Sequence, residues 1–419
     1  AAQVDLQDAM KAAGATQSGS RGAMRLRQAL VVIELVTSVT LLLGTALLAR
    51  SFLKLSSVPL GFEPTKLITL RFNLRGRPYA SSSAQINYYR DVLARIKQLS
   101  AVRSASVASD VPLDEAQPWS ELRFQIGGRP PAPLAEQPRA NTKLVSAGYF
   151  GTLGIPLKRG RLFSPFDTPG ASHPVIVNEA LVRQVFAHEG PIGKQIVFGH
   201  PGNAPWTIIG VVGTVRGSHL AAEPPALIYD CLCQSQSPFL TELALFVRTK
   251  SNPHQAIHDV EAQIFSVDHS QPLSDVRTME ERLAISLAPQ RFHLTLIGFF
   301  AGIALILSAL GTYGVLSYLV ARRRREIGIR LAIGAQPPHI VGMIVRESCV
   351  LIAVSLFIGL SISWAFRHYL QSLLYGIPTS DAVSFVAAPL TLAVTALIAS
   401  AVPARQAARM DPITTLRDE

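Results

Sequence analysis

Residues 292–321 form a run of thirty residues without an aspartate, glutamate, lysine or arginine. A helix that crosses a bilayer needs about 20 largely apolar residues, and a buried helix of this length and uniformity is unusual in a soluble protein. Three further stretches have the same character: residues 28–49, in which Glu34 is the only charge, residues 348–366, which can be extended back to His339, and residues 382–404. The sequence therefore predicts an α-helical membrane protein with four transmembrane helices.

Basic residues gather at three flanks of these spans, whereas the loop of residues 371–381 has no lysine or arginine. The basic residues are Lys11, Arg21, Arg25 and Arg27 before the first span, Arg322–Arg325 and Arg330 after the second, and Arg405, Arg409 and Arg417 after the fourth. Because short basic loops stay in the cytoplasm, we predict that both chain ends lie inside and that residues 51–291 lie outside.

This orientation also accounts for much of the formal net charge of +11, so the composition gives no reason to expect a nucleic-acid partner. Only 16% of the residues are charged, against about 25% in a typical soluble protein. The four consecutive arginines lie beside a membrane span, and we interpret them as an orientation signal that also contacts lipid phosphates.

The spans and flanks define the expected domain organisation. It consists of a cytoplasmic linker at residues 1–27, transmembrane helices at 28–50, 291–321, 339–369 and 382–404, an external domain at 51–290 between the first two helices, a cytoplasmic segment at 322–338, and a cytoplasmic tail at 405–419.

The external residues have the mixed pattern of an α+β domain. The segments "HPVIVNE", "WTIIGVVGTV" and "ELALFVRT" are rich in Val and Ile and predict strands. The segment "AQINYYRDVLARIKQL" has an apolar stripe at helical spacing. Asn252 and Pro253 predict the start of another helix, and Thr278 with Glu281 predicts a capping box. The irregular alternation of strands and helices favours one or two small α+β subdomains.

We find no catalytic, cofactor-binding or metal-binding motif in the external domain, which therefore reads as a binding or mechanical module. Gly193 and Lys194 lack the first glycine and the Ser or Thr of a phosphate-binding loop, so we expect a turn there. His254 and His258 lack the glutamate of an H-E-x-x-H motif, and no third ligand is evident. The chain also has three cysteines, and we expect all of them to be unpaired: Cys231, Cys233 and Cys349.

Glu34 is unusual because an acid inside a membrane helix is costly. It follows Arg27 by seven residues, so we expect it to lie at the inner interface of the membrane or to face another helix. A proton or ion relay would need further acids within the spans, and Glu347, near the inner boundary, is the only other one that we find.

The cytoplasmic segment contains the stretch "ARRRREIGIRLAIGAQ". Ile327, Leu331 and Ile333 can contact lipid or protein, while Glu326 and Arg330 form a favourable i, i+4 pair. Gly334 is placed to end a short helix, and Pro337-Pro338 prevents its simple continuation. Such a helix has little slack between two spans, so it can transmit motion, or it can be an interfacial loop without a partner.

The stretch "RRREIGIRLAIGA" resembles the signature of the FtsX-like permease family, which includes MacB-type ABC transporters. The tail "VPARQAARMDPITTLRDE" resembles the end of that family's sequences, with Gln406 in place of a basic residue. "SAGYFGTLGIPLKRGRLFSPFD", "VIVNEALVRQVF", "PIGKQIVFG" and "SDVRTMEERLA" resemble the MacB-type periplasmic core domain. "LRQALVVIELVTSVTLLLGTALLARSF" is similar to the subgroup of duplicated orphan permeases, in which one polypeptide holds two permease units.

The resemblance implies that the short helix is the coupling element that contacts a cytoplasmic ABC ATPase. The residues to which it assigns this contact are Arg325, Glu326, Ile327, Gly328, Arg330, Leu331, Gly334 and Ala335. This chain has no ATPase motif, so the ATPase would be a separate polypeptide and the chain itself would not be an enzyme. The resemblance implies no cofactor.

The resemblance also implies partners and a location. The other partners would be a second permease unit, as a homodimer or a fused copy, membrane lipid, and a periplasmic or outer-membrane protein. The location would be the bacterial inner membrane, with residues 51–290 in the periplasm. Because the chain opens with Ala1 and has one four-span unit, we expect it to be the C-terminal half of a duplicated protein, with residues 1–27 as the linker between copies.

Three functions stay open from the sequence. The first is a permease subunit of a MacB-like ABC system, which transmits ATPase-driven motion to the periplasmic domain for export or extraction of a substrate. The second is an FtsX-like signalling or scaffold protein that controls a periplasmic partner without transport. The third is a membrane-anchored enzyme, for which we find no supporting residues.

Overall fold

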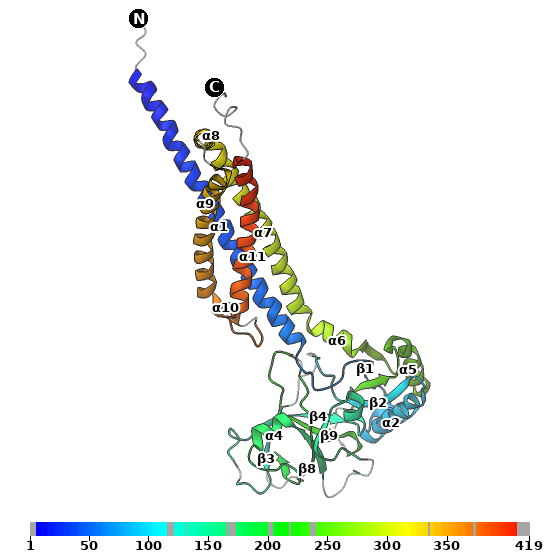
Figure 1. The fold of residues 1–419 in the computed structure, drawn as a ribbon. Coiled ribbons are helices and arrows are strands. Elements are labelled where there is room, and N and C mark those ends of the chain that lie inside the picture. Colours follow the sequence, from blue (N-terminus) through cyan, green and yellow to red (C-terminus); the bar gives the residue numbers. More distant parts are fainter. Residues whose placement is uncertain are drawn as a thin grey trace. The chain divides into compact units, whose positions relative to one another are not determined.

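The computed structural model describes residues 6–114, 121–130, 132–164, 167, 173–199, 204–217, 219–234, 240–333, 336–371 and 374–408. The chain forms two compact units (Figure 1). One unit contains residues 1–56 and 290–419, and the other contains residues 57–289. In sequence, the second unit is an insertion between the first two apolar helices of the first.

The unit of residues 1–56 and 290–419 is helical. Its helices are α1 (Leu6–Ser56), α7 (Ala288–Arg322), α8 (Arg324–Ala332), α9 (Pro337–Ala365), α10 (Arg367–Gln371) and α11 (Ala382–Ala408). Four of them are long and apolar enough to cross a membrane: α1 from Arg25, α7, α9 from Pro338, and α11. The prediction of four apolar helices with an α+β domain between the first and second is confirmed.

Helix α1 is longer than its predicted membrane span. It begins at Leu6, whereas we expected a linker over residues 1–27. The added sequence, "LQDAMKAAGATQ", contains several strong helix formers and no proline, so local propensity supports its helical backbone. A span prediction that follows hydropathy alone stops where the charges begin, although the helix does not.

Helices α1, α9 and α11 pack closely around a common core (Figure 1). Leu35 and Val39 of α1 are fully buried, and Leu392 and Ala396 of α11 are each 1% exposed. Gly359 of α9 lies against Val39, and a Cβ at this glycine would collide with the valine side chain. The absence of a side chain at one position therefore allows two helices to approach each other closely.

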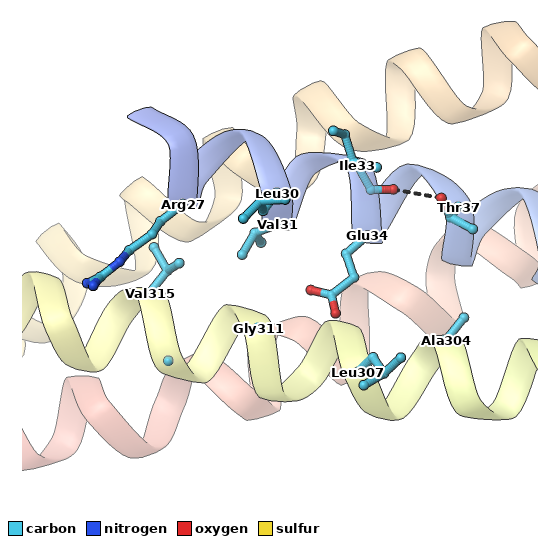
Figure 2. A pocket seen from close by; sticks show the side chains of 11 residues that line it. Arg27, Leu30, Val31, Ile33, Glu34, Thr37, Ala304, Leu307, Gly311 and Val315 are labelled. Atoms are coloured by element: carbon cyan, nitrogen blue, oxygen red, sulfur yellow. Dashed lines mark hydrogen bonds between the residues drawn. The ribbon is translucent and has the colours of Figure 1, made fainter. Parts of the chain in front are cut away.

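Helix α7 is joined to α1 by hydrogen bonds between small polar side chains. The hydroxyls of Ser38 and Ser308 lie 2.6 Å apart, and the Ser38 hydroxyl also donates to the carbonyl of Ala304 at 2.8 Å. Ser38 and Ser308 are almost completely buried. One turn before Ser38, the Glu34 side chain faces α7 (Figure 2), in agreement with the expectation that it faces another helix.

A polar contact also holds the loop before α11 against the C-terminal end of α1. Arg50 pairs with Asp381, and the Asp381 carboxylate accepts the backbone N–H of Ser384 at 2.9 Å, which caps α11. The backbone N–H of Tyr375 donates to the Ser51 hydroxyl at 2.8 Å.

The unit of residues 57–289 is α+β. Its strands are β1 (Leu67–Phe72), β2 (Val102–Ala108), β3 (Glu121–Ile126), β4 (Arg139–Val145), β5 (Leu157–Gly160), β6 (His173–Asn178), β7 (Gln195–Phe198), β8 (Trp206–Val212), β9 (Leu227–Cys231), β10 (Ala244–Thr249) and β11 (Leu273–Thr278). Its helices are α2 (Ser82–Gln98), α3 (Tyr149–Leu153), α4 (Glu179–Val185), α5 (Pro253–Val267) and α6 (Met279–Ser286), with 3-10 turns η1 (Arg77–Tyr79) and η2 (Leu232–Gln234).

The first lobe of this unit is an antiparallel sheet in the order β11-β1-β10-β2. Helices α2 and α5 cover it, and Tyr89, Val92 and Ile96 of α2 share its core with Val260 and Ile264 of α5. The succession β1-α2-β2 and β10-α5-β11 gives a ferredoxin-like β-α-β-β-α-β arrangement. The chain leaves this lobe after β2 and returns at β10.

The second lobe lies in the sequence between β2 and β10. Six of its strands pair in a closed ring, in the order β4-β3-β7-β8-β6-β9 and back to β4, and β5 pairs with β8. Apolar side chains fill its own separate core, among them Phe124, Val175, Ile208 and Ile228. One residue pair, Ala108 with Val145, joins the ring to the sheet of the first lobe.

The local predictions for this unit agree with the structure. The three quoted Val- and Ile-rich segments contain β6, β8 and β10. Asn252 caps α5 and Pro253 is its first residue, while Thr278 and Glu281 form the predicted capping box of α6. We predicted one or two subdomains, and the two separate cores correspond to two.

Candidate functional site

Helix α8 lies between the long helices α7 and α9 with very little connecting chain. Only Arg323 separates the end of α7 from the start of α8, and backbone hydrogen bonds continue through this junction from Arg323 to Leu319 and from Ile327 to Arg323. Gln336 in extended conformation and Pro337 begin α9. A proline at the first position of a helix lacks only an N–H that would be unpaired there anyway, so it starts α9 cleanly.

Ile327 attaches α8 to the membrane helices. Its side chain is 1% exposed and belongs to the same apolar cluster as Val320 of α7 and Ile340 and Ile344 of α9. Full burial of such a side chain contributes about 1.5–3 kcal/mol. The next residue, Gly328, is buried as well, so this side of α8 lies directly against its neighbours.

Polar contacts add less to this attachment. Arg323 pairs with Glu347 of α9 at 2.6 Å, and Arg330 pairs with Glu326 on the same helix at 2.6 Å. The side chains are about 40–50% exposed, and such pairs are typically worth about 0.2–1 kcal/mol. Arg330 also lies 3.0 Å from the sulfur of Met343 of α9. The apolar contact of Ile327 is therefore the main anchor, and the Arg323–Glu347 pair adds a second contact with α9.

The outward side of α8 is both apolar and charged. Ile329 is 43% exposed, and Ile333, the residue directly after α8, is 81% exposed, next to the exposed pair of Glu326 and Arg330. An isoleucine that is four-fifths exposed contributes little to folding, and a partner can bury it. The helix thus presents a small amphipathic surface on a rigid support.

The structure brings together only part of the predicted coupling set. Glu326 and Arg330 pair as predicted, Ile327 and Gly328 point inward, and Ile333 points outward although we grouped it with Ile327. Arg325 and Leu331 belong to α8, but only their backbone is described. Gly334 and Ala335 lie outside the described residues, and α8 itself ends at Ala332.

The ion pair between Arg323 and Glu347 was not predicted from the sequence. A signal for it was available, because Glu347 is an isolated acid near the end of an apolar span and four arginines lie at the end of the neighbouring span. A charge at such a position usually has a partner of opposite sign.

Among the described residues, no group of three or more His, Cys, Asp and Glu side chains is close enough to hold a metal ion. His254 and His258 share α5 as expected, and His254 lies 3.9 Å from Glu281. Gly193 and Lys194 form the expected turn, closed by a backbone hydrogen bond from Lys194 to Pro191.

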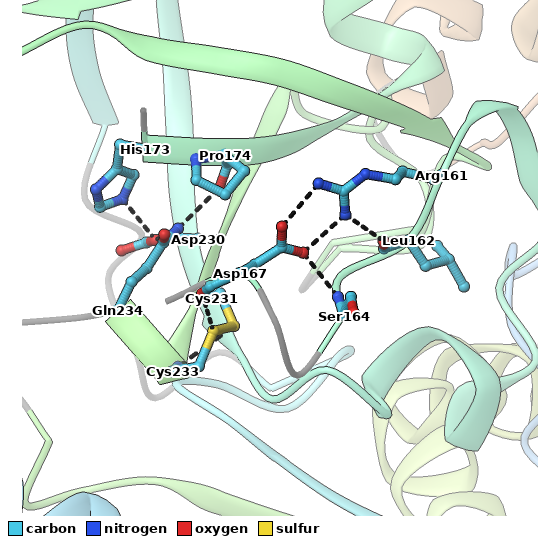
Figure 3. The surroundings of a disulfide bond; sticks show 10 residues. All are labelled: Arg161, Leu162, Ser164, Asp167, His173, Pro174, Asp230, Cys231, Cys233 and Gln234. Atoms are coloured by element: carbon cyan, nitrogen blue, oxygen red, sulfur yellow. Dashed lines mark hydrogen bonds and ion pairs between the residues drawn. A yellow bond between two sulfur atoms is a disulfide. The ribbon is translucent and has the colours of Figure 1, made fainter. Parts of the chain in front are cut away.

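The expectation that Cys231 and Cys233 are unpaired is wrong. A disulfide joins them (Figure 3). Strand β9 ends at Cys231 and the turn η2 follows at once, which brings the two Cα atoms to 5.2 Å, within the usual range for a disulfide. The C-x-C spacing closes here because the chain bends between the two cysteines.

Two side-chain contacts lie near this disulfide (Figure 3). His173 lies 2.8 Å from Asp230, and Arg161 binds Asp167 through two hydrogen bonds of 2.7 and 2.8 Å. The Arg161 hydrogen bond holds the pKa of the Asp167 carboxyl below its usual value, and the backbone N–H of Ser164 acts in the same direction. These contacts join Asp167 to the segment that follows β5.

Two protein families match the chain. The MacB-like periplasmic core domain matches residues 29–264, which is more than half of the chain, and the FtsX-like permease C-terminal family matches residues 298–412. The second match contains α8, all of α9 and most of α7.

Individual relatives have low sequence identity to this chain. The uncharacterized ABC transporter permease YknZ of Bacillus subtilis is 27% identical over 290 residues, which cover 68% of this chain and 71% of YknZ. The macrolide export ATP-binding/permease protein MacB of Escherichia coli K12 is 25% identical over 286 residues, covering 67% of this chain and 44% of MacB. The chain therefore spans less than half the length of this MacB protein.

Among solved structures, the periplasmic region of MacB from Actinobacillus actinomycetemcomitans is similar to 54% of this chain and covers 95% of its own chain, at 18% identity and a TM-score of 0.35.

Proposed function

The chain belongs to the ABC transporter permease family that combines a MacB-like periplasmic core domain with an FtsX-like permease region, and we propose that it transmits ATPase-driven motion from α8 to its periplasmic domain. It is the permease component of a MacB- or YknZ-like transporter, with transmembrane helices and a periplasmic domain. The proposed outcome of the motion is export or extraction of a substrate.

The observation that carries this proposal is the construction of α8. Its inner side is fixed to α7 and α9 through Ile327, and Arg323 at the junction with α7 pairs with Glu347 of α9, so a displacement of α8 has to move the long helices with it. Its outer side presents Ile329, Ile333 and a charged pair, which a partner can contact. The part of the site that holds α8 and the part that a partner would contact are thus separate.

We propose that the partner is a cytoplasmic ABC ATPase on a separate polypeptide. The similarity to MacB proteins, whose name includes an ATP-binding part, supports this partner, since the present chain matches only a part of their length. In this proposal α8 and both chain ends face the cytoplasm of a bacterial inner membrane. A second permease unit, as a second copy or a fused one, completes the complex.

Substitution of the two exposed isoleucines tests the proposal. Ile329→Ser together with Ile333→Ser should reduce the amount of ATPase that co-purifies with the full-length chain by tenfold or more, because two apolar contacts of about 1.5–3 kcal/mol each are lost. The measurement is mass spectrometry of the complex purified from native membranes. A matched control is Ile192→Ser, since Ile192 is also 43% exposed but lies in the other unit.

Glu326→Ala with Arg330→Ala provides an independent test of the same surface. The pair contributes only about 0.3–0.5 kcal/mol to its own helix, so a large loss of ATPase reports a lost contact with the partner. Unchanged ATPase recovery in both double variants would remove the proposed role of α8. ATPase recovery without any transported compound, together with altered cell-wall hydrolysis, would instead favour a signalling protein.

A further inference from the structure

The chain enters the α+β unit through residues 57–66, which follow α1 and precede β1 and which we call the entry segment. Its backbone is bonded to chain that lies far away in the sequence. The Glu63 N–H donates to the Leu153 carbonyl at 2.8 Å, and the Arg216 N–H donates to the Leu60 carbonyl at 3.0 Å. The entry segment is therefore part of the folded unit and does not hang from it as a loose linker.

Gly61 lies in the middle of this segment and closely approaches the second lobe. Its φ is +81°, and a Cβ here would collide with the Thr214 carbonyl oxygen. Glycine is the residue that tolerates both this φ and such a close approach. Thr214 follows the end of β8, so the entry segment lies directly against the second lobe at this point.

Arg248 of β10 binds the entry segment and α3 at the same time. Its Nη1 donates to the Thr65 carbonyl and its Nη2 donates to the Glu63 carbonyl, both at 2.8 Å. Its Nε donates to the Thr152 carbonyl of α3 at 2.6 Å. One guanidinium group thus joins a strand of the first lobe, a helix from the sequence of the second lobe, and the segment that follows α1.

The Arg248 side chain is 5% exposed although it carries a charge. Removal of a charge from water is costly unless other polar groups replace the water. The Glu63 carboxylate lies 3.4 Å away but is 60% exposed, so it offsets this cost only in part, and the three carbonyls supply the rest. Because the guanidinium donors lie in one fixed plane, Arg248 also sets where the three carbonyls lie relative to one another.

The chain leaves this unit through α6, which Leu287 alone separates from α7. Arg282 of α6 is 7% exposed, donates to the Thr69 hydroxyl of β1 at 2.6 Å and pairs with Asp275 of β11 at 2.6 Å. A buried arginine therefore fixes the chain at both of its connections to the membrane helices.

We propose that Arg248 is a positioning residue through which a movement of α1 reaches both lobes of the periplasmic domain. This inference rests on the proposed function, in which the ATPase moves the membrane helices. Because Arg248 holds the entry segment and α3 together, a displacement of the segment carries α3 and β10 with it. Without Arg248 the segment loses its side-chain contact with both, and it moves while the lobes stay in place.

The experiment uses the full-length chain in complex with its co-purified ATPase. One sample carries spin labels at Ser57→Cys in the entry segment and Arg183→Cys on α4, and a second carries them at Ala321→Cys on α7 and Gln406→Cys on α11, all exposed positions. Cys349→Ser removes the exposed native thiol. Double electron–electron resonance measures each distance without nucleotide and with ATP and vanadate, in complexes diluted with unlabelled chain.

In the wild type, nucleotide should change the distance within the helical unit and leave the distance between residues 57 and 183 unchanged. In Arg248→Gln the helical distance should still change. The distance between residues 57 and 183 should then shift with nucleotide by more than the width of its wild-type distribution, since the entry segment no longer carries the lobes with it.

Val260→Ala is the control for a loss of stability. Val260 is fully buried in the core of the first lobe, so this variant should unfold at a lower temperature but show no nucleotide-dependent shift between residues 57 and 183. If Arg248→Gln does not fold, Arg248→Lys tests the same point, because an ammonium group keeps the charge but lacks the planar fork of donors.

Four outcomes would overturn the proposal. A nucleotide-dependent distance between residues 57 and 183 in the wild type would show that the entry segment is not held. An unchanged distance in both Arg248 variants, with a helical unit that still responds, would show that other contacts hold it. Equal broadening with and without nucleotide would leave Arg248 a structural role only. A wild-type helical unit that does not respond to nucleotide would remove the proposed function itself, and the labels on α7 and α11 identify this failure separately.

Discussion

Ile327 and Ile333 are six residues apart on one short segment, yet the first is 1% exposed and the second 81% exposed. Six residues correspond to about 600° of helical rotation, so the two side chains point to different sides. Their shared chemistry led us to group them from sequence, although their spacing separates them. The exposure difference assigns anchoring to Ile327 and leaves Ile333 for a partner.

Asp167 supports a prediction on pH. Its pKa is lower in the folded protein than in the unfolded chain, chiefly because Arg161 donates to it. The stabilisation is therefore fully present above the unfolded pKa of about 3.9 and is lost as the pH falls through the lower folded value. Because Arg161 is 53% exposed, we expect Asp167→Asn to cost only about 1 kcal/mol at pH 7, and less below pH 4.

Urea unfolding of residues 51–290 expressed alone, at pH 7 and at pH 3, measures this difference. The two apolar cores of that unit give it the means to fold without the membrane helices. Asp91→Asn, on an exposed position of α2, is the control and should change little at either pH. A cost for Asp167→Asn that is the same at both pH values would contradict the role of the ion pair.

At the scale of elements, hydropathy and capping patterns predicted most helices and several strands, because those signals lie in neighbouring residues. The contacts between elements could not be predicted in this way. The Ser38–Ser308 pair and the contact of Gly359 with Val39 join residues far apart in the sequence. Serine and glycine are also common in membrane helices for other reasons, so neither residue marks its contact.

Gly359 and Gly342 give a matched pair of variants on α9. Alanine should improve helix propensity equally at both positions, by up to about 1 kcal/mol. At Gly342 a Cβ meets nothing within 4 Å, whereas at Gly359 it collides with the fully buried Val39. Overpacking costs about 1–3 kcal/mol, so Gly359→Ala should unfold at a lower temperature than wild type and Gly342→Ala at an equal or higher one. Equal midpoints for both variants in detergent would show that α1 and α9 do not depend on this close approach.

At the scale of the whole molecule, the fold class followed from the sequence because four apolar spans and their basic flanks are strong signals. The closed ring of six strands did not follow, since it depends on pairing between strands distant in sequence, such as β4 with β9. The role of α8 stays a prediction that rests on the family resemblance and on the helix's anchored and exposed sides. The sequence thus predicts the contact surface on α8, while the division of its residues between anchor and exposed side required the structure.

The proposed orientation can be tested with single cysteines. Arg75→Cys lies in the periplasmic domain and Arg330→Cys on α8, and both side chains are exposed. In intact spheroplasts a membrane-impermeant maleimide should label residue 75 and should label residue 330 only after lysis. Cys349→Ser in both variants removes the exposed native thiol. Labelling of residue 330 from outside would show that α8 does not lie in the cytoplasm and would contradict the proposed topology.

The insertion of the second lobe between β2 and β10 of the first has a consequence for how the chain is assembled. Ala108, the last residue of β2, lies opposite Ala244, the first residue of β10. The inserted segment between them therefore begins and ends at neighbouring positions of the sheet. During synthesis the ribosome delivers all six strands of the ring before it delivers β10. The inserted lobe thus has its complete set of strands while the sheet that carries it still has only two, and helices α7 to α11 are synthesised last.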